Sequence, residues 1–598
     1  MVYFPYEKKR EHQQEIIDKV LEAIETRKHL IMHAPTGLGK TAAVLAPALT
    51  KAIEDDKTVF FLTSRYTQHK LALETLQTIK EKYKLDFLTV DFMGKKSMCL
   101  QNTKVKDFYL YCNSLKEQGL CKFYDNARGK RDVSLDIAAK GLLKFCKYHE
   151  LCPFELACAI AKNKKTRTIV ADYYHIINPQ IRKVFLEKIN KRLENSIIIF
   201  DEAHNLPQRA RNLLTTAISN YGLWRLIKGF KELEGFEHIN ELLNELKNSI
   251  ENLQCRDEAL VKIEDFKADP EIIREFEGAV EALESLSLDE KLIDLLGRFT
   301  NVVNFLRNWN VNDKSGAFVR IVSKENFNDK EVVTLRNKCL DPSTLFANLS
   351  QTMLFMSGTL TPTSMYKDLL GLNDAATTEF LNIFPKENRL NIIFPKTTTK
   401  YEQRSDKQYE EIARISGDII NNIPSRVLVF FPSYELCHSI GAFLINYCDK
   451  AIIYESRVDK LGKEIILKEF KESERSVLLA VSSGSFAEGV DLPGLVKGVI
   501  VIGIPLTRPD LETKELVKYY ENKFGMGWEY GYIYPAILKA LQNAGRCIRS
   551  EHDRGVIVFM DERYAWNNYL KCFPRDLNIK ITREPLGMIR GFFNNKGI

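Results

Sequence analysis

Short apolar runs, many of them rich in β-branched residues, recur in two parts of the chain and predict buried strands. The first group comprises residues 29–32, 59–62 and 197–200, and the second comprises 427–431, 477–481, 499–502 and 556–559. Helical patterns between many of these runs indicate an α/β fold with parallel sheets. Because the runs fall into two separate groups, we expect two α/β domains.

The stretch 207–343 departs from this rhythm and is rich in Leu, Glu and Lys. Apolar residues recur in it at spacings of three and four, which is typical of amphipathic helices. They are Phe236, Ile239, Leu243, Leu246, Ile250 and Leu253, followed by Ile273, Phe276, Val280 and Leu283. We interpret them as core positions of a mainly helical insert.

Length and composition set the broad class of the protein. A chain of 598 residues is too long for one hydrophobic core, and 45% hydrophobic with 28% charged residues is ordinary for a globular protein. No apolar run reaches the ~18 residues of a membrane span, and the N-terminus lacks the apolar core of a secretory signal. We therefore expect a cytoplasmic protein with no membrane partner.

The charge is unevenly distributed along the chain. The net charge of +7 permits a nucleic-acid partner without requiring one. Residues 92–167 contain 16 Lys and Arg against 7 Asp and Glu, whereas residues 224–298 contain 10 against 19. A basic and an acidic segment indicate modules with different functions.

Six of the twelve cysteines lie between Cys99 and Cys158. A chain without a secretory signal is not expected to carry a disulfide framework, so this crowding indicates a metal or cluster site. The candidate ligands are Cys99, Cys112, Cys121 and Cys152. By chemistry alone four thiolates could hold a [4Fe–4S] cluster or zinc, with His149 as an alternative zinc ligand. Cys146 and Cys158 are additional thiols, and Cys146 lies close enough to Cys152 in the sequence to be an alternative ligand.

The segment 34–41, Ala-Pro-Thr-Gly-Leu-Gly-Lys-Thr, follows a predicted strand and precedes a helical pattern. That context is typical of a phosphate-binding loop, whose backbone N–H groups and helix N-terminus surround phosphates. The candidate phosphate contacts are Thr36, Gly37, Gly39 and Lys40, and Thr41 is a candidate Mg²⁺ ligand.

Two further segments complete a candidate ATPase site. Asp201-Glu202-Ala203-His204 directly follows the run 197–200, which places Asp201 to bind Mg²⁺ and Glu202 to activate water. His204 is a candidate link between the nucleotide and the neighbouring domain. Gln542 begins a segment in which Arg546 and Arg549 are expected on one helical face, as arginine fingers.

These elements, in this order, resemble the XPD-like, iron–sulfur branch of superfamily-two helicases. Further motifs fit the resemblance: Arg10 and Gln13 near adenine, Ser64-Arg65 on DNA phosphates, residues 357–360 as a coupling element, and residues 484–491, with Gly489 and Asp491, linking DNA contact to ATP contact. Cys-Lys-Phe-Tyr at 121–124 and Cys-Pro-Phe at 152–154 are similar to the family's cluster domain. The resemblance therefore implies a [4Fe–4S] cluster held by Cys99, Cys112, Cys121 and Cys152.

The resemblance covers nearly the whole chain and implies two RecA-like parallel-sheet motor domains with two inserts. The first motor domain is expected to occupy 1–91, 166–206 and 344–372, and the second 373–598. The iron–sulfur cluster domain is expected at 92–165 and a mainly helical arch domain at 207–343. The compact chain is similar to archaeal-type members, which would place it in a prokaryotic cytoplasm with a nucleoid-associated substrate.

The implied function is that of an ATP- and Mg²⁺-dependent DNA helicase in DNA repair, moving 5′ to 3′ on single-stranded DNA. We expect a monomer that binds single-stranded and forked DNA and recruits protein partners through the arch. Stacking candidates are Tyr173, Tyr174, Trp528, Tyr530 and Tyr532, and basic candidates are Lys95, Lys96, Lys122, Arg128, Lys130 and Arg131. The alternatives are a translocase that remodels complexes without separating strands, and a redox-sensing DNA-binding scaffold.

Overall fold

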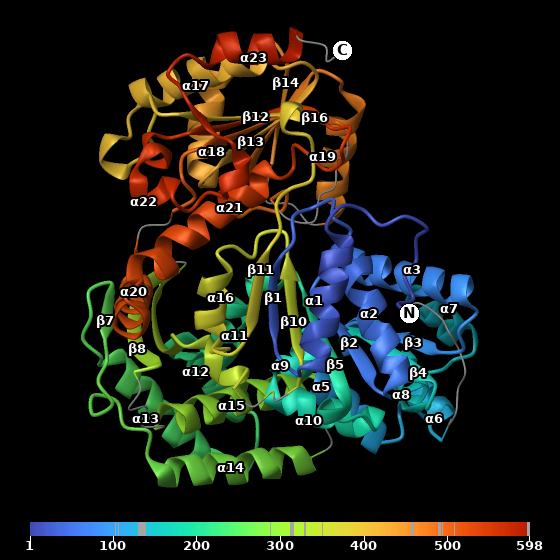
Figure 1. The fold of residues 1–598 in the computed structure, drawn as a ribbon. Helices are drawn as coiled ribbons and strands as arrows, with labels where there is room; N and C mark the ends of the chain where they lie inside the picture. The colour runs from blue at the N-terminus through green and yellow to red at the C-terminus, as the bar shows by residue number, and fades with distance from the viewer. Residues whose placement is uncertain are drawn as a thin grey trace.

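A computed structural model provides the structure of the chain. It describes residues 1–594 except 102, 104, 106, 130–138, 287–288, 311–315, 328–329, 348, 350, 456–459, 488–491, 493 and 507–508. Two parallel-sheet domains lie one above the other, and two inserts extend from the lower domain (Figure 1).

The first motor domain is built on a seven-stranded parallel sheet. In spatial order its strands are β11 (Ala376–Glu379), β1 (Leu30–His33), β10 (Met353–Ser357), β5 (Ser196–Asp201), β2 (Thr58–Leu62), β4 (Thr166–Ala171) and β3 (Leu88–Asp91). Helices α1 (Gln13–Glu25), α2 (Lys40–Glu54) and α3 (Tyr66–Tyr83) belong to this domain. Because β11 pairs with β1, the sheet extends beyond residue 372, where we expected this domain to end.

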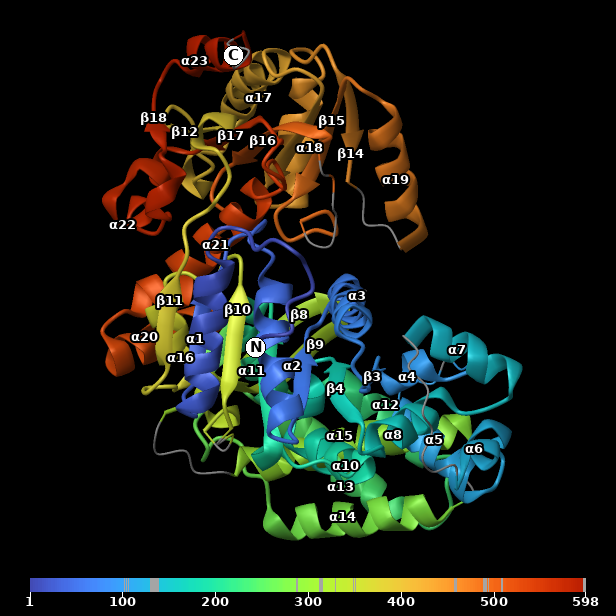
Figure 2. The ribbon, with the colours of Figure 1, turned by 45° about the vertical axis from the view of Figure 1, so that its right-hand side comes forward.

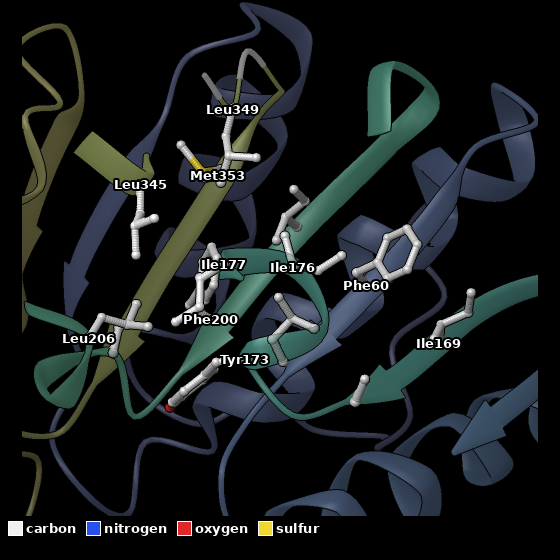
Figure 3. Packing of buried hydrophobic residues seen from close by; sticks show 14 of the residues in the cluster. Phe60, Ile169, Tyr173, Ile176, Ile177, Phe200, Leu206, Leu345, Leu349 and Met353 are labelled. Carbon is white, nitrogen blue, oxygen red and sulfur yellow. The ribbon is translucent and has the colours of Figure 1, made fainter. Parts of the chain in front are cut away.

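Apolar side chains from neighbouring strands form the core of this domain. Phe60 of β2, Phe200 of β5 and Met353 of β10 gather around Ile176 and Ile177 of α9 (Tyr174–Ile177) (Figure 3). All five side chains are buried, as expected for a sheet covered on both faces.

The second motor domain has a seven-stranded parallel sheet of its own. Its spatial order is β14 (Ala451–Tyr454), β15 (Ser476–Val481), β13 (Arg426–Phe431), β16 (Val496–Ile502), β17 (Gly555–Met560), β12 (Arg389–Phe394) and β18 (Lys580–Ile581). The helices of this domain include α17 (Asp406–Asn421), α18 (Tyr434–Leu444), α19 (Lys460–Glu472) and α23 (Pro585–Asn594). All seven apolar runs of the sequence are therefore confirmed as strands, and both sheets are parallel as predicted.

The cysteine-rich insert is a group of short helices between β3 and β4, to the right of the first sheet in Figure 2. They are α4 (Lys95–Met98), α5 (Phe108–Glu117), α6 (Lys122–Ala127), α7 (Ala139–Tyr148) and α8 (Pro153–Lys162). Helix α8 leads back into the first motor domain, with Leu156 and Ile160 in its core. The last helix of the insert therefore anchors it to the motor sheet.

The arch combines helices with a four-stranded antiparallel sheet. Its helices are α12 (Asn220–Phe230), α13 (Glu237–Glu251), α14 (Pro270–Ser285) and α15 (Glu290–Trp309), and its strands, in spatial order, are β6 (Thr216–Ser219), β9 (Lys330–Cys339), β8 (Phe318–Phe327) and β7 (Glu258–Leu260). The two apolar stripes lie on α13 and α14, as expected. The sheet was not predicted, because burial in β9 alternates along the strand and neither strand of the β8–β9 hairpin has a long continuous apolar run.

The second motor domain also contacts the arch. Helix α20 (Leu511–Phe524) descends beside β7 and β8 in Figure 1. Near its C-terminal end Tyr519 Oη and Lys523 Nζ donate to Asp341 Oδ2 over 2.9 and 2.6 Å. Among the described helices none is long and apolar enough to cross a membrane.

Candidate nucleotide site, cluster insert and nucleic-acid surface

The phosphate-binding loop connects β1 to α2, in the predicted place. Gly37 and Gly39 have φ angles of 96° and 71°, a left-handed conformation that glycine adopts without steric cost. A Cβ atom on Gly37 would lie 2.1 Å from the ring of Phe384, so only glycine fits at this position. Lys40 and Thr41 follow in the first turn of α2, where the helix N-terminus favours an anion.

Gln13 stabilises the phosphate-binding loop through hydrogen bonds to its backbone. Its buried amide group donates to the carbonyls of Leu38 and Gly39 over 2.8 and 3.3 Å. Arg10 Nη1 donates to the Gly37 carbonyl over 2.6 Å. These contacts fix the loop backbone, and the expected proximity of Gln13 to adenine stays a prediction.

The acidic pair at the end of β5 faces Lys40. Lys40 Nζ lies 3.6 Å from Glu202 Oε1, and both side chains are largely buried. Burial opposes the charge on Lys40, but Glu202 and Asp201 outweigh it and raise the pKa of the ammonium. Burial also opposes ionisation of Glu202, but Lys40 and His204 hold its pKa well below the ordinary value.

Asp201 differs from its neighbour Glu202. It is fully buried, and neither of its carboxylate oxygens has a hydrogen-bond partner. Burial raises the pKa of Asp201 to about 7, although Lys40 opposes the shift. Two buried oxygens without hydrogen-bond partners, close enough to Lys40 of the phosphate-binding loop for their charges to interact, fit the requirement of a Mg²⁺ ion for oxygen ligands.

His204 and Ser357 connect the acidic pair to β10. Ser357 Oγ donates to Glu202 Oε2 over 3.0 Å, and His204 Nδ1 lies 2.7 Å from Ser357 Oγ. The Thr359 N–H donates to the same serine oxygen over 3.2 Å. Glu202 is thus tied to the segment 357–360, as expected for a coupling element.

The second motor domain forms the opposite wall of the cleft, where Gln542, Arg546 and Arg549 line the same cavity as Lys40 and Glu202. The positive charge of Arg549 acts on Lys40. The prediction that both arginines lie on one helical face is wrong, because α21 (Tyr534–Ala544) ends before them. Arg546 and Arg549 instead lie in the loop that follows Gly545.

Some residues at the cleft and at the phosphate-binding loop were not among the predicted nucleotide-site residues. Arg65 lines the cavity, and its charge favours ionisation of Asp201 and Glu202. We had expected this residue to contact DNA. Phe384 covers Gly37, and Arg389 lines the cavity from β12. No local motif marks Phe384 or Arg389, because tertiary packing alone brings them to the loop. Gly489 and Asp491 lie outside the described residues.

Comparison with known proteins agrees with this geometry. The model of the DEAD_2 family matches residues 62–223, and the model of the helicase C-terminal domain matches residues 417–579. A probable ATP-dependent helicase of Methanocaldococcus jannaschii is 28% identical, with 94% of this chain and 93% of that protein covered. The ATP-dependent DNA helicase XPD of Sulfolobus acidocaldarius is 24% identical, with 94% and 98% covered. The chain belongs to the XPD-like helicases of superfamily two.

Solved structures support the fold of this XPD-like helicase. A structure titled XPD helicase has a TM-score of 0.70 at 22% identity and covers 96% of this chain and 100% of its own. The structure of Xpd4 from S. tokodaii has a TM-score of 0.63 at 18% identity and covers 96% and 100%. Two RecA-like domains with two inserts are therefore the architecture of this protein.

The four predicted cluster cysteines lie at or near helix ends of the insert. Cys99 follows α4, Cys112 is in α5, and Cys121 and Cys152 precede the first turns of α6 and α8. Gln101 links two of them, since its N–H donates to Cys99 Sγ over 3.4 Å and its side chain to Cys121 Sγ over 3.8 Å. Within the described residues, however, no group of three or more Cys, His, Asp and Glu side chains is arranged to hold a metal ion.

The donor chemistry of these thiols nevertheless fits a cluster. Cys112 and Cys121 interact electrostatically with Cys99, and Cys112 and Cys152 both interact electrostatically with Lys116. The four cysteines therefore lie near one another. Burial raises the pKa of Cys99, and it raises that of Cys152 to about 11, so positive charge is needed to hold them as thiolates.

The other two thiols and His149 have different surroundings. Cys146 and Cys158 are buried among apolar side chains of the motor core, whereas His149 is exposed and its ring packs against Phe145 and Tyr148.

The predicted DNA-contact aromatics divide into two groups. Tyr173 is fully buried with its hydroxyl on the Asp201 carbonyl, and Tyr530 is buried with its hydroxyl on Asp368, so the predictions for these two are wrong. Trp528 is about half exposed, and its ring packs edge-on against Tyr532 at 5.4 Å. Tyr174 is half-buried. Trp528, Tyr532 and Tyr174 stay candidates.

The basic candidates of the insert also differ. Lys95 packs over the rings of Tyr109 and Phe154, and Lys122 is paired with Glu150. Lys96 donates to the Val105 carbonyl, and Arg128 is exposed. Lys130 and Arg131 lie outside the described residues.

Proposed function

We propose that this protein is an ATP-dependent DNA helicase that moves 5′ to 3′ along single-stranded DNA and separates duplexes during DNA repair. One observation carries the proposal: Lys40 and Glu202 of one motor domain line the same cleft as Arg546 and Arg549 of the other. The names of the relatives support ATP as the fuel and DNA as the substrate. The direction of movement rests on the family resemblance.

The residues divide the chemistry as follows. Lys40 and the loop backbone bind the β- and γ-phosphates, and the ionised Glu202 orients and deprotonates the attacking water. Arg546 and Arg549 neutralise charge on the transferred phosphoryl group, which requires the second motor domain to close. Thr41 and Asp201 would hold Mg²⁺, which supplies charge neutralisation on the phosphate oxygens.

Closure is coupled to the acidic pair through the interface. Gln542 Nε2 donates to Thr359 Oγ1 over 3.3 Å, and Thr359 is joined to Glu202 through Ser357. A change in the spacing between the motor domains would therefore shift the position of Glu202, the proposed general base. Loss of the γ-phosphate removes the bridge between Lys40 and the arginines, so the cleft reopens and the protein can step along the strand.

The inserts would guide the DNA. Helix α5 of the cysteine insert contacts α15 of the arch, so the two inserts meet and can enclose a strand. Cys99, Cys112, Cys121 and Cys152 would hold a [4Fe–4S] cluster that pins the loops of the insert. We also propose that the protein is a monomer and that the acidic arch is its surface for protein partners.

The test combines a strand-displacement assay with iron analysis of protein purified without oxygen. A brown, iron-containing protein that displaces only the strand of a 5′-tailed duplex, and does so only with ATP, is the expected result. Lys40→Ala is the matched control and should abolish both hydrolysis and displacement. ATP hydrolysis on DNA without strand displacement would favour the translocase alternative. A colourless protein that contains zinc would contradict the proposed [4Fe–4S] cluster.

A further inference from the structure

A buried histidine outside the nucleotide cleft is held between two acceptors. His69 of α3 has Nδ1 2.6 Å from Asp91 Oδ1 at the end of β3, and Nε2 3.2 Å from the carbonyl oxygen of Thr63. The His69 and Asp91 side chains are only 6% and 1% exposed. No mechanistic role in ATP hydrolysis follows from the sequence motifs for either residue.

The two acceptors determine the protonation state of the ring. A carboxylate and a backbone carbonyl accept hydrogen bonds and cannot donate them, so both ring nitrogens must carry hydrogen. His69 is therefore an imidazolium in this geometry. Burial alone would lower the pKa of His69, but the hydrogen bond and charge of Asp91, together with the Thr63 carbonyl and Asp172, raise it above the ordinary value.

His69 holds a turn that leads into the nucleotide cleft. Its ring contacts the Thr63 carbonyl, and its backbone N–H donates to the carbonyl of Arg65 over 3.2 Å. The turn 63–65 is thus tied at both ends to one residue. Arg65 precedes the first turn of α3, lines the cleft with Lys40 and Glu202, and its charge favours ionisation of Asp201 and Glu202.

We propose that His69 is a positioning residue: as a buried imidazolium paired with Asp91, it clamps the turn 63–65 and thereby holds Arg65 at the acidic pair of the nucleotide site. The inference rests on the ATPase activity proposed above. Loss of the Nε2 proton would leave a ring lone pair facing the Thr63 carbonyl, which repels it and loosens the turn.

The direction of the pH dependence follows from the raised pKa. The clamp is complete at low pH and is lost as pH rises through the pKa of His69 in the folded protein. The other titratable groups around the ring are Asp172 after β4, His175 of α9, and Arg65 and Tyr66 at the start of α3. Burial lowers the pKa of His175, so this second histidine is neutral where His69 is charged.

The experiment measures kcat and KM for DNA-stimulated ATP hydrolysis between about pH 6 and pH 9. In the unmodified protein kcat should fall in a single step as the pH rises through the pKa of His69. Asp91→Asn removes the charge that stabilises the imidazolium and should move this step to lower pH by roughly 1 unit or more. His69→Gln should abolish the step and lower kcat about tenfold at the acid end, while KM changes less than about twofold. His238→Gln, on an exposed arch histidine, is the matched control and should leave the step in place.

A second arm tests whether His69 acts through Arg65. In an Arg65→Ala background, His69→Gln should cause no further loss of kcat, because the residue to be positioned is gone. The inference would be overturned if the losses of kcat in Arg65→Ala and His69→Gln multiply in the double variant. It would also be overturned if the fall of kcat with pH occurs at the same pH in Asp91→Asn as in the unmodified protein. If His69→Gln does not fold, the Asp91→Asn profile alone decides. If the unmodified protein is as inactive as Lys40→Ala, the proposed function has failed; if it hydrolyses ATP with an unchanged step in Asp91→Asn, only this inference has.

Discussion

Gln542 and Thr359 form a side-chain hydrogen bond from one motor domain to the other, with Gln542 Nε2 donating to Thr359 Oγ1 over 3.3 Å. Thr359 is in turn bonded through its N–H to Ser357, whose hydroxyl contacts Glu202. This chain of hydrogen bonds therefore links the second motor domain to Glu202, the proposed general base.

Gln542→Ala should lower kcat for ATP hydrolysis about fivefold, since one neutral hydrogen bond contributes roughly 1 kcal/mol. KM should change little, because the side chain of Gln542 hydrogen-bonds Thr359 rather than the phosphate-binding loop. Steady-state ATPase kinetics with and without DNA check this. Gln77→Ala, which removes an exposed amide on α3, is the matched control and should match the unmodified protein. An equal loss in both variants would argue against the coupling role.

Glu202→Gln should abolish hydrolysis while preserving nucleotide binding. In the proposed mechanism the ionised carboxylate orients and deprotonates water, and general-base catalysis contributes about 10²- to 10⁴-fold. The amide keeps the shape of the side chain and can still meet Ser357. Single-turnover hydrolysis and binding of a fluorescent nucleotide separate the two effects. Glu187→Gln, on a helix away from the cleft, should affect neither measurement; retained hydrolysis in Glu202→Gln would reassign the base.

The motor site could be predicted because its motifs are local in sequence. Lys40 sits at the start of α2, and Asp201 and Glu202 follow a buried apolar run, so spacing alone determines their places. Arg546 and Arg549 reached the predicted cleft although the predicted helix was wrong, since the loop after Gly545 carries them there.

Residues brought in by tertiary packing were not predictable in the same way. Phe384 lies far along the chain from Gly37, yet its ring fills the space beside that glycine. The β8–β9 hairpin of the arch was missed because neither of its strands carries a long continuous apolar run. Tyr173 was a candidate for stacking on DNA, but its ring packs into the motor core (Figure 3). Its hydroxyl donates to the Asp201 carbonyl. A single sequence does not distinguish these outcomes.

Asp341→Asn should weaken the contact between α20 and the base of the arch. Burial opposes ionisation of Asp341, but Lys523, Ser343 and Tyr519 outweigh it and hold its pKa below the ordinary value. The stabilisation is therefore present above the unfolded pKa of 3.8 and is lost as pH falls through the lower folded value. The variant should melt roughly 1–4 °C lower at neutral pH.

The melting difference should be the same at pH 8 and pH 6 and narrow only below about pH 4, as measured by thermal unfolding in matched buffers. Asp418→Asn, which disturbs an exposed i, i+4 pair with Arg414, is the control and should melt with the unmodified protein. A difference that already narrows between pH 8 and pH 6 would show that another group carries the effect.

Gly297→Ala should disturb the place where the cysteine insert meets the arch. A Cβ atom on Gly297 of α15 would lie 2.7 Å from Asp107 Oδ2 and 2.9 Å from Asp107 Cβ. Asp107 caps α5 by accepting from the Leu110 N–H, so moving it also weakens the start of that helix. Replacing a cap of this kind costs about 1 kcal/mol, and the insert carries Cys112 on the same helix.

Gly278→Ala is the matched control, because a Cβ atom there meets nothing within 4 Å in the middle of α14. Alanine in place of an exposed helical glycine stabilises by roughly 0.5–1 kcal/mol, so this variant should melt at or above the unmodified protein. Gly297→Ala should melt lower and displace strands more slowly while hydrolysing ATP at a normal rate, since the motor cleft is untouched. Equal displacement by both variants would mean that the contact between the inserts does not guide the strand.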